Sequence, residues 1–351
     1  MKFTIFGESH GPAVGVALEG VPAGIAIDER FISSELKRRA TGKNSLSSAR
    51  TEKDKVEFIS GAFNGMTTGA PLCAVIENGD AHSGDYEKIK DMARPGHADY
   101  ASFIKSGGFN DYRGGGHFSG RLTAAWVVAG SIAKQILAKN GIEALAHIER
   151  VGQIGDDCVD AAEPDIEALR AASRKDFPVL NDVFGERMQN IIELNRERYD
   201  SIGGAIECVL VGVPAGTGAP DFDKNCEGVI SKYIFSIPAV KAIGFGIGEE
   251  FAYINGSGAN DAFRADNGAV RTVTNNNGGI NGGIANGMPI VFHVAMKPTP
   301  SIALRQHTVN FRTMENVDIE IEGRHDPCIV HRAVPVIESA AALAACELLG
   351  I

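Results

Sequence analysis

The sequence lacks any long apolar segment, since no run approaching about 18 residues is free of polar side chains. We therefore predict no membrane span. Met1 leads into the strand-like Lys2–Phe6 and not into the basic and then apolar region that is typical of a secretion signal. The six cysteines lie far apart and form no Cys-x-x-Cys pair, a pattern that indicates reduced thiols. Together these absences predict a cytoplasmic protein.

Positive charge is also scarce. The chain has 34 Lys and Arg against 44 Asp and Glu, which gives a net charge of −10 and argues against a nucleic-acid binder. Local clusters of cations are therefore more informative. Glycine, in contrast, is abundant, with 42 in 351 residues against an average of about 7%. The glycines are not collagen-periodic, so they indicate turns and close backbone approaches.

Cations, histidines and glycines concentrate between Arg94 and Arg121, in RPGHADYASFIKSGGFNDYRGGGHFSGR. The arginines offer planar donors for phosphate and carboxylate oxygens. His97 and His117 can move a proton near neutral pH, and the glycines let the backbone approach a ligand. A nearly all-apolar helix is expected directly afterwards, over 121–139. The segment indicates an anion-binding active-site loop on a rigid support, and the alternative is a surface loop whose glycines only make turns.

The segment Gly7–Gly11, GESHG, has the letters of the G-x-S-x-G nucleophile elbow. That elbow needs a helix after the serine, whereas residues 12–18 read as a strand. We therefore set aside a serine hydrolase and retain His10 as a histidine presented between two strands.

The second half has glycine-rich segments of its own. Gly244–Gly248, GFGIG, lacks the strand before and the helix after that a dinucleotide-binding fingerprint requires. The Asn- and Gly-rich run 274–287 is too polar for a core and too long for a simple turn. Lys297–Ser301, KPTPS, offers one cation and two hydroxyls as a phosphate grip; a proline-stiffened loop is the equal alternative.

A metal site is the weaker interpretation of the C-terminal motif. His325, Cys328 and His331 are spaced three apart, but zinc sites usually show a second ligand pair elsewhere and none is evident. A metal-dependent hydrolase that uses these residues with His10 and His97 stays open as an alternative. A non-catalytic phospho-ligand binding protein is another.

Internal similarity predicts the architecture. GPAVGVALEGVPAG (11–24) is echoed by GGAIECVLVGVPAG (203–216), and Gly69–Pro71 by Gly287–Pro289. Expected helices 28–39 and 121–139 are echoed by 223–235 and 332–349. Three echoes in the same order indicate a pseudo-twofold repeat. The longer helices are apolar almost all round and should be buried on every side, and the alternating strands favour antiparallel pairing.

We therefore predict an α+β layered sandwich, with long buried helices between antiparallel β-sheets and an internal pseudo-twofold repeat. Residues 1–351 are expected to form a single domain. Its repeats span about 1–140 and 200–351, with a peripheral helical segment at about 156–200.

The motifs GESHG, RPGHAD, DYRGGG, NGG, KPTPS and GRHDPC follow one another along nearly the whole chain. In this order they resemble chorismate synthase. The resemblance implies a carbon–oxygen lyase acting on phosphates, which converts 5-enolpyruvylshikimate 3-phosphate to chorismate and phosphate by 1,4-anti elimination. It further implies a sandwich fold, a homotetramer, and a requirement for reduced FMN (FMNH2) without net redox change. The protein's own use of NADPH and an external reductant both stay open as sources of the reduced flavin.

The resemblance also implies site residues. His10 corresponds to the proton donor near the leaving phosphate, His97 to the histidine at the flavin's pyrimidine end, and Asp326 to the aspartate near flavin N5. The positions that correspond to substrate-binding residues are Ser9, Arg39, Arg94, Arg121 and Arg324. The positions that correspond to cofactor-binding residues are His117, Phe118, Ser119, Pro238, Ala239, Gly282, Lys297, Pro298, Thr299, Pro300, Ser301 and again Arg324.

The sequence departs from the family pattern at several positions. His117 stands where the family more often has arginine, so that flavin contact falls to a pH-dependent cation. Ser45 and Ser48 replace arginines in the loop 41–54, where Lys43 or Arg50 is expected to compensate. The familiar Asn-Ala-Val-Lys is Pro238–Lys241 here.

Overall fold

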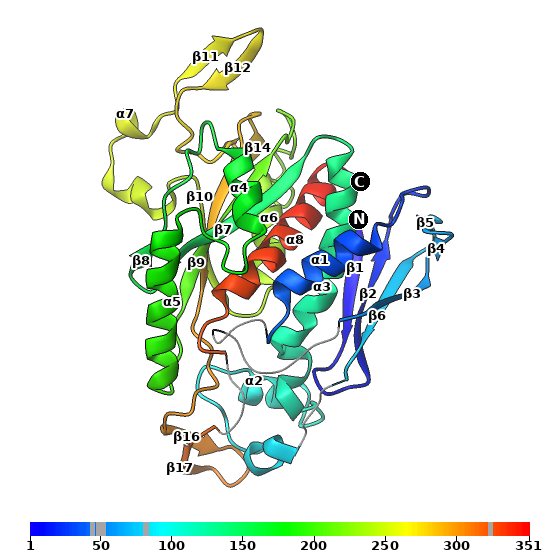
Figure 1. The fold of residues 1–351 in the computed structure, drawn as a ribbon, viewed down its shortest axis with the longest axis vertical. Helices are drawn as coiled ribbons and strands as arrows, with labels where there is room; N and C mark the ends of the chain where they lie inside the picture. Colours follow the sequence, from blue (N-terminus) through cyan, green and yellow to red (C-terminus); the bar gives the residue numbers. More distant parts are fainter. Residues whose placement is uncertain (43–45, 47–53, 80–83, 322–325) are drawn as a thin grey trace.

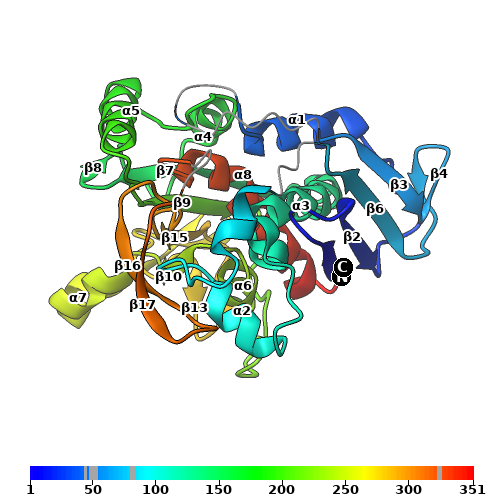
Figure 2. The same ribbon diagram turned by 90° about the horizontal axis from the view of Figure 1, so that it is seen from below.

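Two antiparallel β-sheets enclose a layer of helices (Figure 2). The computed structural model describes residues 1–42, 46, 54–79, 84–321 and 326–351. The first sheet has the order β1 (Lys2–Gly7), β2 (Ala13–Glu19), β6 (Leu72–Glu77), β3 (Val56–Ser60). The second has the order β10 (Val240–Phe245), β15 (Ile290–Met296), β9 (Gly204–Val211), β7 (Glu143–Val151), β8 (Ile154–Gly155). Every pairing in them is antiparallel, as predicted.

The central layer consists of α3 (Thr123–Ala138) and α8 (Val330–Leu348), which pack against each other. Helix α3 also contacts β2 and β6 of the first sheet, and α8 contacts β7 and β9 of the second. Both helices are buried over most of their length. The prediction of long buried helices between two sheets is therefore confirmed.

Shorter helices cover this body. Helix α1 (Glu29–Arg39) begins after Asp28, whose side chain accepts hydrogen bonds from the backbone N–H groups of Arg30 and Phe31. Helix α1 packs on α3 and α8, and α6 (Cys226–Phe235) packs on α8 and β10. Helices α4 (Ile166–Ser173) and α5 (Asp182–Glu197) lie against β7, where a peripheral helical segment was expected (Figure 1).

The two sheets share one topology. Strands β1, β2, β6 and β3 occupy the same order as β7, β9, β15 and β10. Each half also has a small hairpin, β4 (Ala62–Phe63) with β5 (Met66–Thr67), and β13 (Ile280–Asn281) with β14 (Ile284–Ala285). Cβ atoms built at Gly69 and Gly287 would each lie 3.3 Å from an alanine of the respective Val-Pro-Ala-Gly turn. We propose that the halves are pseudo-twofold repeats; the single-domain bounds stay a prediction.

The remaining elements lie at the two ends of the molecule (Figure 1). At one end are η1 (Gly84–Ile89), α2 (Asp99–Lys105), η2 (Arg113–Phe118), η3 (Gly120–Leu122), and the hairpin of β16 (Gln306–Asn310) and β17 (Glu315–Ile319). At the other are η4 (Gly248–Tyr253), α7 (Gly256–Ala259), and a projecting hairpin of β11 (Phe263–Asp266) and β12 (Ala269–Thr272). In the described part of the chain, no helix is long and apolar enough to cross a membrane.

Two local interpretations of the sequence are wrong. The segment Gly244–Gly248 was expected to lack a preceding strand, but strand β10 runs into Gly244. The expected absence of a long helix after it agrees with the 3-10 turn η4 that follows. The run 274–287 is not wholly outside the core, because Asn275 is buried. Its amide donates to the carbonyls of Ala161 and Pro289, each at 2.8 Å, and its Oδ1 accepts from Gly279 N. A polar side chain is stable in the interior when all its groups are bonded in this way.

Candidate active site

A cavity of about 920 Å³ lies where the first turns of α3 and α8 meet the loops 94–120 and 297–301. Its lining brings together residues that are far apart in the sequence. The predicted site residues among them are Arg39, Arg94, His97, His117, Phe118, Ser119, Arg121, Pro238, Ala239, Lys297, Thr299, Pro300, Ser301 and Asp326.

His10 and Ser9 lie directly behind this wall. A Cβ built at Gly114 would be 2.2 Å from the His10 ring and 2.9 Å from Ser9 Oγ. The backbone at Gly114 has φ of +59°, so both the space and the conformation require glycine there. Ser9 is almost fully buried, and its N–H donates to Gly116 O at 3.1 Å. The glycine triplet therefore brings the chain at His10 against the cavity wall.

Arg94 is held by a hydrogen-bond cluster. Its Nε and Nη2 each lie 2.7 Å from a carboxylate oxygen of Asp99, and its Nη1 lies 3.2 Å from Ser301 Oγ. His97 Nδ1 is 2.7 Å from Asp99 Oδ1, so we assign its proton to that bond. Burial by itself would raise the pKa of Asp99, but hydrogen bonds from Arg94 and His97 outweigh it and hold that pKa below its ordinary value. Asp99 thus orients both a cation and an imidazole.

Arg39 and Arg121 share Asp54, which the sequence reasoning missed. The Asp54 carboxylate lies 2.5 Å from Arg121 Nη1 and 3.4 Å from Arg39 Nη1. Arg121 also donates to Asn78 Oδ1 at 3.0 Å, and Arg39 to Thr123 Oγ1 at 3.0 Å. Both arginines are nearly buried, so the carboxylate between them offsets the cost of placing two like charges side by side.

Arg332 is a second residue that the sequence reasoning missed. It lines the cavity from the first turn of α8, and its Nη1 donates to Asp326 Oδ2 at 2.5 Å. Its Nε donates to Arg39 O at 3.0 Å. The sequence could have indicated Arg332 as a site residue, because it follows the GRHDPC motif at the start of a predicted helix.

The segment 297–301 contributes polar groups to the lining beside residues 94–96. Lys297 donates to Gly96 O, and burial together with nearby Lys241 lowers the pKa of Lys297. The buried Thr299 Oγ1 has no hydrogen-bond partner among the described residues. His117 Nδ1 lies 3.0 Å from Gly7 O and donates to it, which leaves Nε2 for other partners.

Some predicted positions are not in this lining. Pro298 and Gly282 are absent from it, and Gly282 lies in the turn between β13 and β14. Their roles stay predictions. Arg324 falls outside the described residues, and so do the loop positions Lys43, Ser45, Ser48 and Arg50.

The alternative metal site finds no support in the described residues, where no group of three or more His, Cys, Asp or Glu is placed to hold a metal. Cys328 is fully buried, and burial raises the pKa of its thiol to about 12. The His331 ring stacks on Phe177 at 5.9 Å between centroids. Of the hypothesised ligands, His325 falls outside the described residues.

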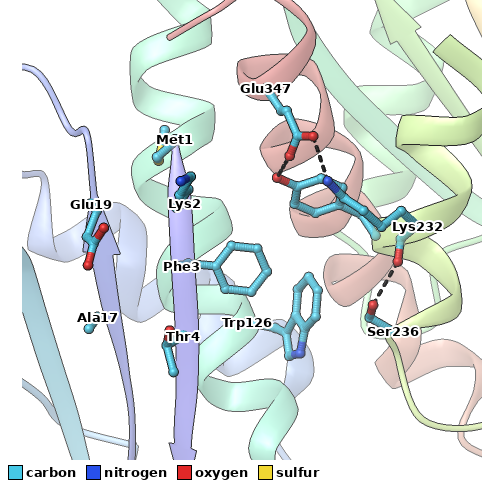
Figure 3. A pocket seen from close by; sticks show the side chains of 11 residues that line it. Met1, Lys2, Phe3, Thr4, Ala17, Glu19, Trp126, Lys232, Ser236 and Glu347 are labelled. Atoms are coloured by element: carbon cyan, nitrogen blue, oxygen red, sulfur yellow. Dashed lines mark hydrogen bonds and ion pairs between the residues drawn. The ribbon is translucent and has the colours of Figure 1, made fainter. Parts of the chain in front are cut away.

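A second cavity, of about 440 Å³, shares Trp126 and Ser236 with the first (Figure 3). Its wall carries an edge-to-face contact between Phe3 and Trp126, whose ring centroids are 4.9 Å apart. Glu347 accepts hydrogen bonds from Lys232 Nζ and the Tyr233 hydroxyl, each at 2.5 Å. These charged and polar groups are paired with one another, so they indicate no ligand.

Comparison with known proteins agrees with this geometry. A family profile described as chorismate synthase matches residues 1–349. The chain belongs to the chorismate synthase family. It is 45% identical over 348 residues to a chorismate synthase of Dehalococcoides mccartyi, covering 99% of this chain and 94% of the relative. It is 48% identical over 338 residues to that of Pyrococcus abyssi, covering 96% and 92%.

A solved structure gives the same answer for the fold. A crystal structure of chorismate synthase superimposes with a TM-score of 0.78 at 28% identity, covering 99% of this chain and 91% of that one. The predictions of the chorismate synthase family, of the layered fold class and of a lyase that forms chorismate are thereby confirmed.

Proposed function

We propose that this chain carries out the family reaction in the 920 Å³ cavity with reduced FMN, using the residues assigned above. One observation carries the assignment. Four arginines (Arg39, Arg94, Arg121 and Arg332) line a single cavity of a protein whose net charge is −10. The substrate has a phosphate and two carboxylates, and FMN adds a phosphate. An acidic protein can hold such ligands only by concentrating cations at one site.

The cavity suits a flavin together with a substrate. Its volume is near the upper end of the range of roughly 300–1,000 Å³ that is usual for ligand pockets. Thr299 offers a buried hydroxyl without a partner among the described residues, and Lys297 and His117 also line the cavity. When bound, reduced FMN would supply electrons transiently to the elimination, with no net change in its oxidation state.

The chain's own residues move the protons. His10, behind Gly114, donates a proton to the leaving phosphate, since phosphate departs more easily when its developing charge is neutralised. Asp326, whose Oδ2 accepts from Arg332 Nη1, takes up a proton on its carboxylate. His97, whose Nδ1 donates to Asp99, keeps Nε2 as the ring atom that can accept a proton.

The arginines stabilise charge. Arg94 is fixed by Asp99 and Ser301, and Arg39 and Arg121 are fixed by Asp54. Because these partners orient the guanidinium groups before the reaction, little reorganisation is needed as negative charge develops on the leaving phosphate.

An anaerobic assay tests the proposal. The protein is mixed with photoreduced FMN and 5-enolpyruvylshikimate 3-phosphate, and chorismate and phosphate are measured. Equal amounts of both products are expected. A parallel reaction with NADPH and oxidised FMN distinguishes the two sources of reduced flavin. Phosphate release without chorismate, or binding of both ligands without turnover, would contradict the proposal and favour a hydrolase or a binding protein, respectively.

We also propose a cytoplasmic homotetramer. All six cysteines are unpaired, as suits a reducing compartment. The projecting β11–β12 hairpin and its flanks expose large apolar side chains, including Tyr253, Phe263, Val270 and Val273, of the kind that subunit interfaces cover. Light scattering after size-exclusion chromatography should give four times the 37.1 kDa chain mass. Substitution of Phe263 and Val270 by serine should reduce it, and a monomeric wild-type mass would contradict the proposal.

A further inference from the structure

We infer that Tyr86 is a positioning residue of the active site, whose ring holds the His10 imidazole and the Arg94 guanidinium at one end of the cavity. Neither the sequence motifs nor the family assignment points to this side chain. The inference rests on the function proposed for His10 and adds a residue that acts through it.

Tyr86 contacts both groups through its ring. The Tyr86 and His10 centroids are 5.3 Å apart, with the rings inclined at 71°. On the same ring, the Arg94 guanidinium carbon lies 5.8 Å from the centroid. Gly114 also borders His10, since a Cβ built there would be 2.2 Å from the imidazole. The His10 ring therefore contacts both a glycine backbone and an aromatic ring.

The turn that carries Tyr86 is itself anchored. The carboxylate of Glu87 accepts a hydrogen bond from the Tyr112 hydroxyl at 2.5 Å. Tyr112 directly precedes η2, which holds the glycine triplet. Three residues after the end of η1, Met92 forms a β-bridge with Asn310. The Tyr86 ring and the Gly114 backbone are thus tied to each other, so their spacing around His10 is set by local structure.

The chemistry of the ring suits a proton donor. In this T-shaped pair we assign the face to Tyr86 and the edge to His10. Because the face of an aromatic ring is negative and attracts cations, Tyr86 then favours the protonated form of His10 that must exist before proton transfer. Among the described residues, Asp111 acts electrostatically on His10, Glu8 lies two residues before it in the chain, and Arg94 contacts the same Tyr86 ring. Asp111 is bound by Arg113 in a bidentate ion pair.

Two substitutions separate the ring from its hydroxyl. Tyr86→Phe keeps the ring and should leave kcat near the wild-type value. Tyr86→Leu removes it and should lower kcat about three- to tenfold. In Tyr86→Leu, the high-pH limb of the kcat/KM profile should also move down by about half a pH unit, because the imidazolium of His10 loses its partner. Tyr199→Leu, at an exposed tyrosine that follows α5 in the peripheral segment, is the matched control.

A binding measurement keeps the test independent of turnover. The NMR titration midpoint of His10 is compared in ligand-free wild-type, Tyr86→Phe and Tyr86→Leu proteins of equal melting temperature. A lower midpoint in Tyr86→Leu alone is expected. Equal midpoints and equal rates in all three proteins would overturn the inference, as would a Tyr86→Phe variant as impaired as Tyr86→Leu. If the wild type forms no chorismate while the midpoints differ as expected, the proposed function fails and the contact stands.

Discussion

At the scale of single residues, His10 depends on neighbours that the GESHG motif does not contain. Gly114 and Tyr86 border its ring, and they belong to segments about 75 to 105 residues further along the chain. The motif could identify the histidine as a candidate acid. Only packing shows what holds it.

Replacement of His10 tests the proposed proton donor. His10→Ala should lower turnover by about 10²- to 10⁴-fold, the usual contribution of a general acid, while the dissociation constant of FMN stays unchanged. Single-turnover kinetics and flavin fluorescence measure the two quantities. His307→Ala is the control, because the His307 side chain is 97% exposed on β16. Full activity of His10→Ala would remove its role.

His117 should make flavin affinity depend on pH. Its Nδ1 donates to Gly7 O, so Nε2 is the ring nitrogen left for contact with the flavin. An imidazole ordinarily carries charge below about pH 6.5. His117→Ala should therefore weaken FMN binding more at pH 6 than at pH 8, as measured by calorimetric titration. His117→Arg should bind FMN with little change between these values. The same loss at both pH values in His117→Ala would contradict this role.

At the scale of elements, the contact between α3 and α8 depends on one glycine. A Cβ at Gly130 would lie 2.1 Å from Ser339 Cβ and 2.4 Å from its Cα, so the helices approach here more closely than any larger residue allows.

Gly130→Ala should therefore destabilise the protein. Overpacking costs about 1–3 kcal/mol, and the gain in helix propensity of about 1 kcal/mol offsets only part of this. Urea unfolding at constant pH measures the change. Gly258→Ala is the control, because a Cβ at that helical glycine meets nothing within 4 Å. Unchanged stability of Gly130→Ala would show that the helices can separate freely.

Helices were easier to predict than the polar loops, for a physical reason. An apolar residue pattern repeats within a helix, so Thr123–Ala138 could be recognised locally. The burial of Asn275 depends on carbonyls of Ala161 and Pro289 that other segments supply. The polar composition of the run 274–287 therefore argued against a place in the core, although the Asn275 amide is buried there and fully hydrogen-bonded.

At the scale of the whole molecule, a buried charge cluster joins the second sheet to the peripheral segment. His147 on β7 is fully buried, with Nε2 at 2.7 Å from Glu207 and Nδ1 at 3.2 Å from Asp156. Asp156 in turn accepts from the backbone N–H groups of Leu180 and Asn181. Burial alone would lower the pKa of His147, but hydrogen bonds to Asp156 and Glu207 raise it to about 9.

This cluster should make stability depend on pH. Because the folded pKa of His147 is above the unfolded value of about 6.5, its contribution is complete below pH 6.5 and is lost as pH rises through about 9. The contribution is on the order of 3 kcal/mol. His147→Gln should therefore cost more free energy of unfolding at pH 6 than at pH 9.5. His307→Gln is the exposed control, and an equal cost at both pH values would contradict the assignment.

The sequence by itself determined the elements of this protein and their kind. Apolar periodicity, turn residues and internal repeats act over short distances along the chain, so they already indicated antiparallel strands and buried helices. The list of site residues came from the resemblance of the motifs to a known family. Only the tertiary structure decided which of those residues share a cavity, and it added Asp54, Tyr86 and Arg332 to them. Such contacts join segments up to about 300 residues apart, and the packing of complete sheets and helices, which no local pattern records, brings them together.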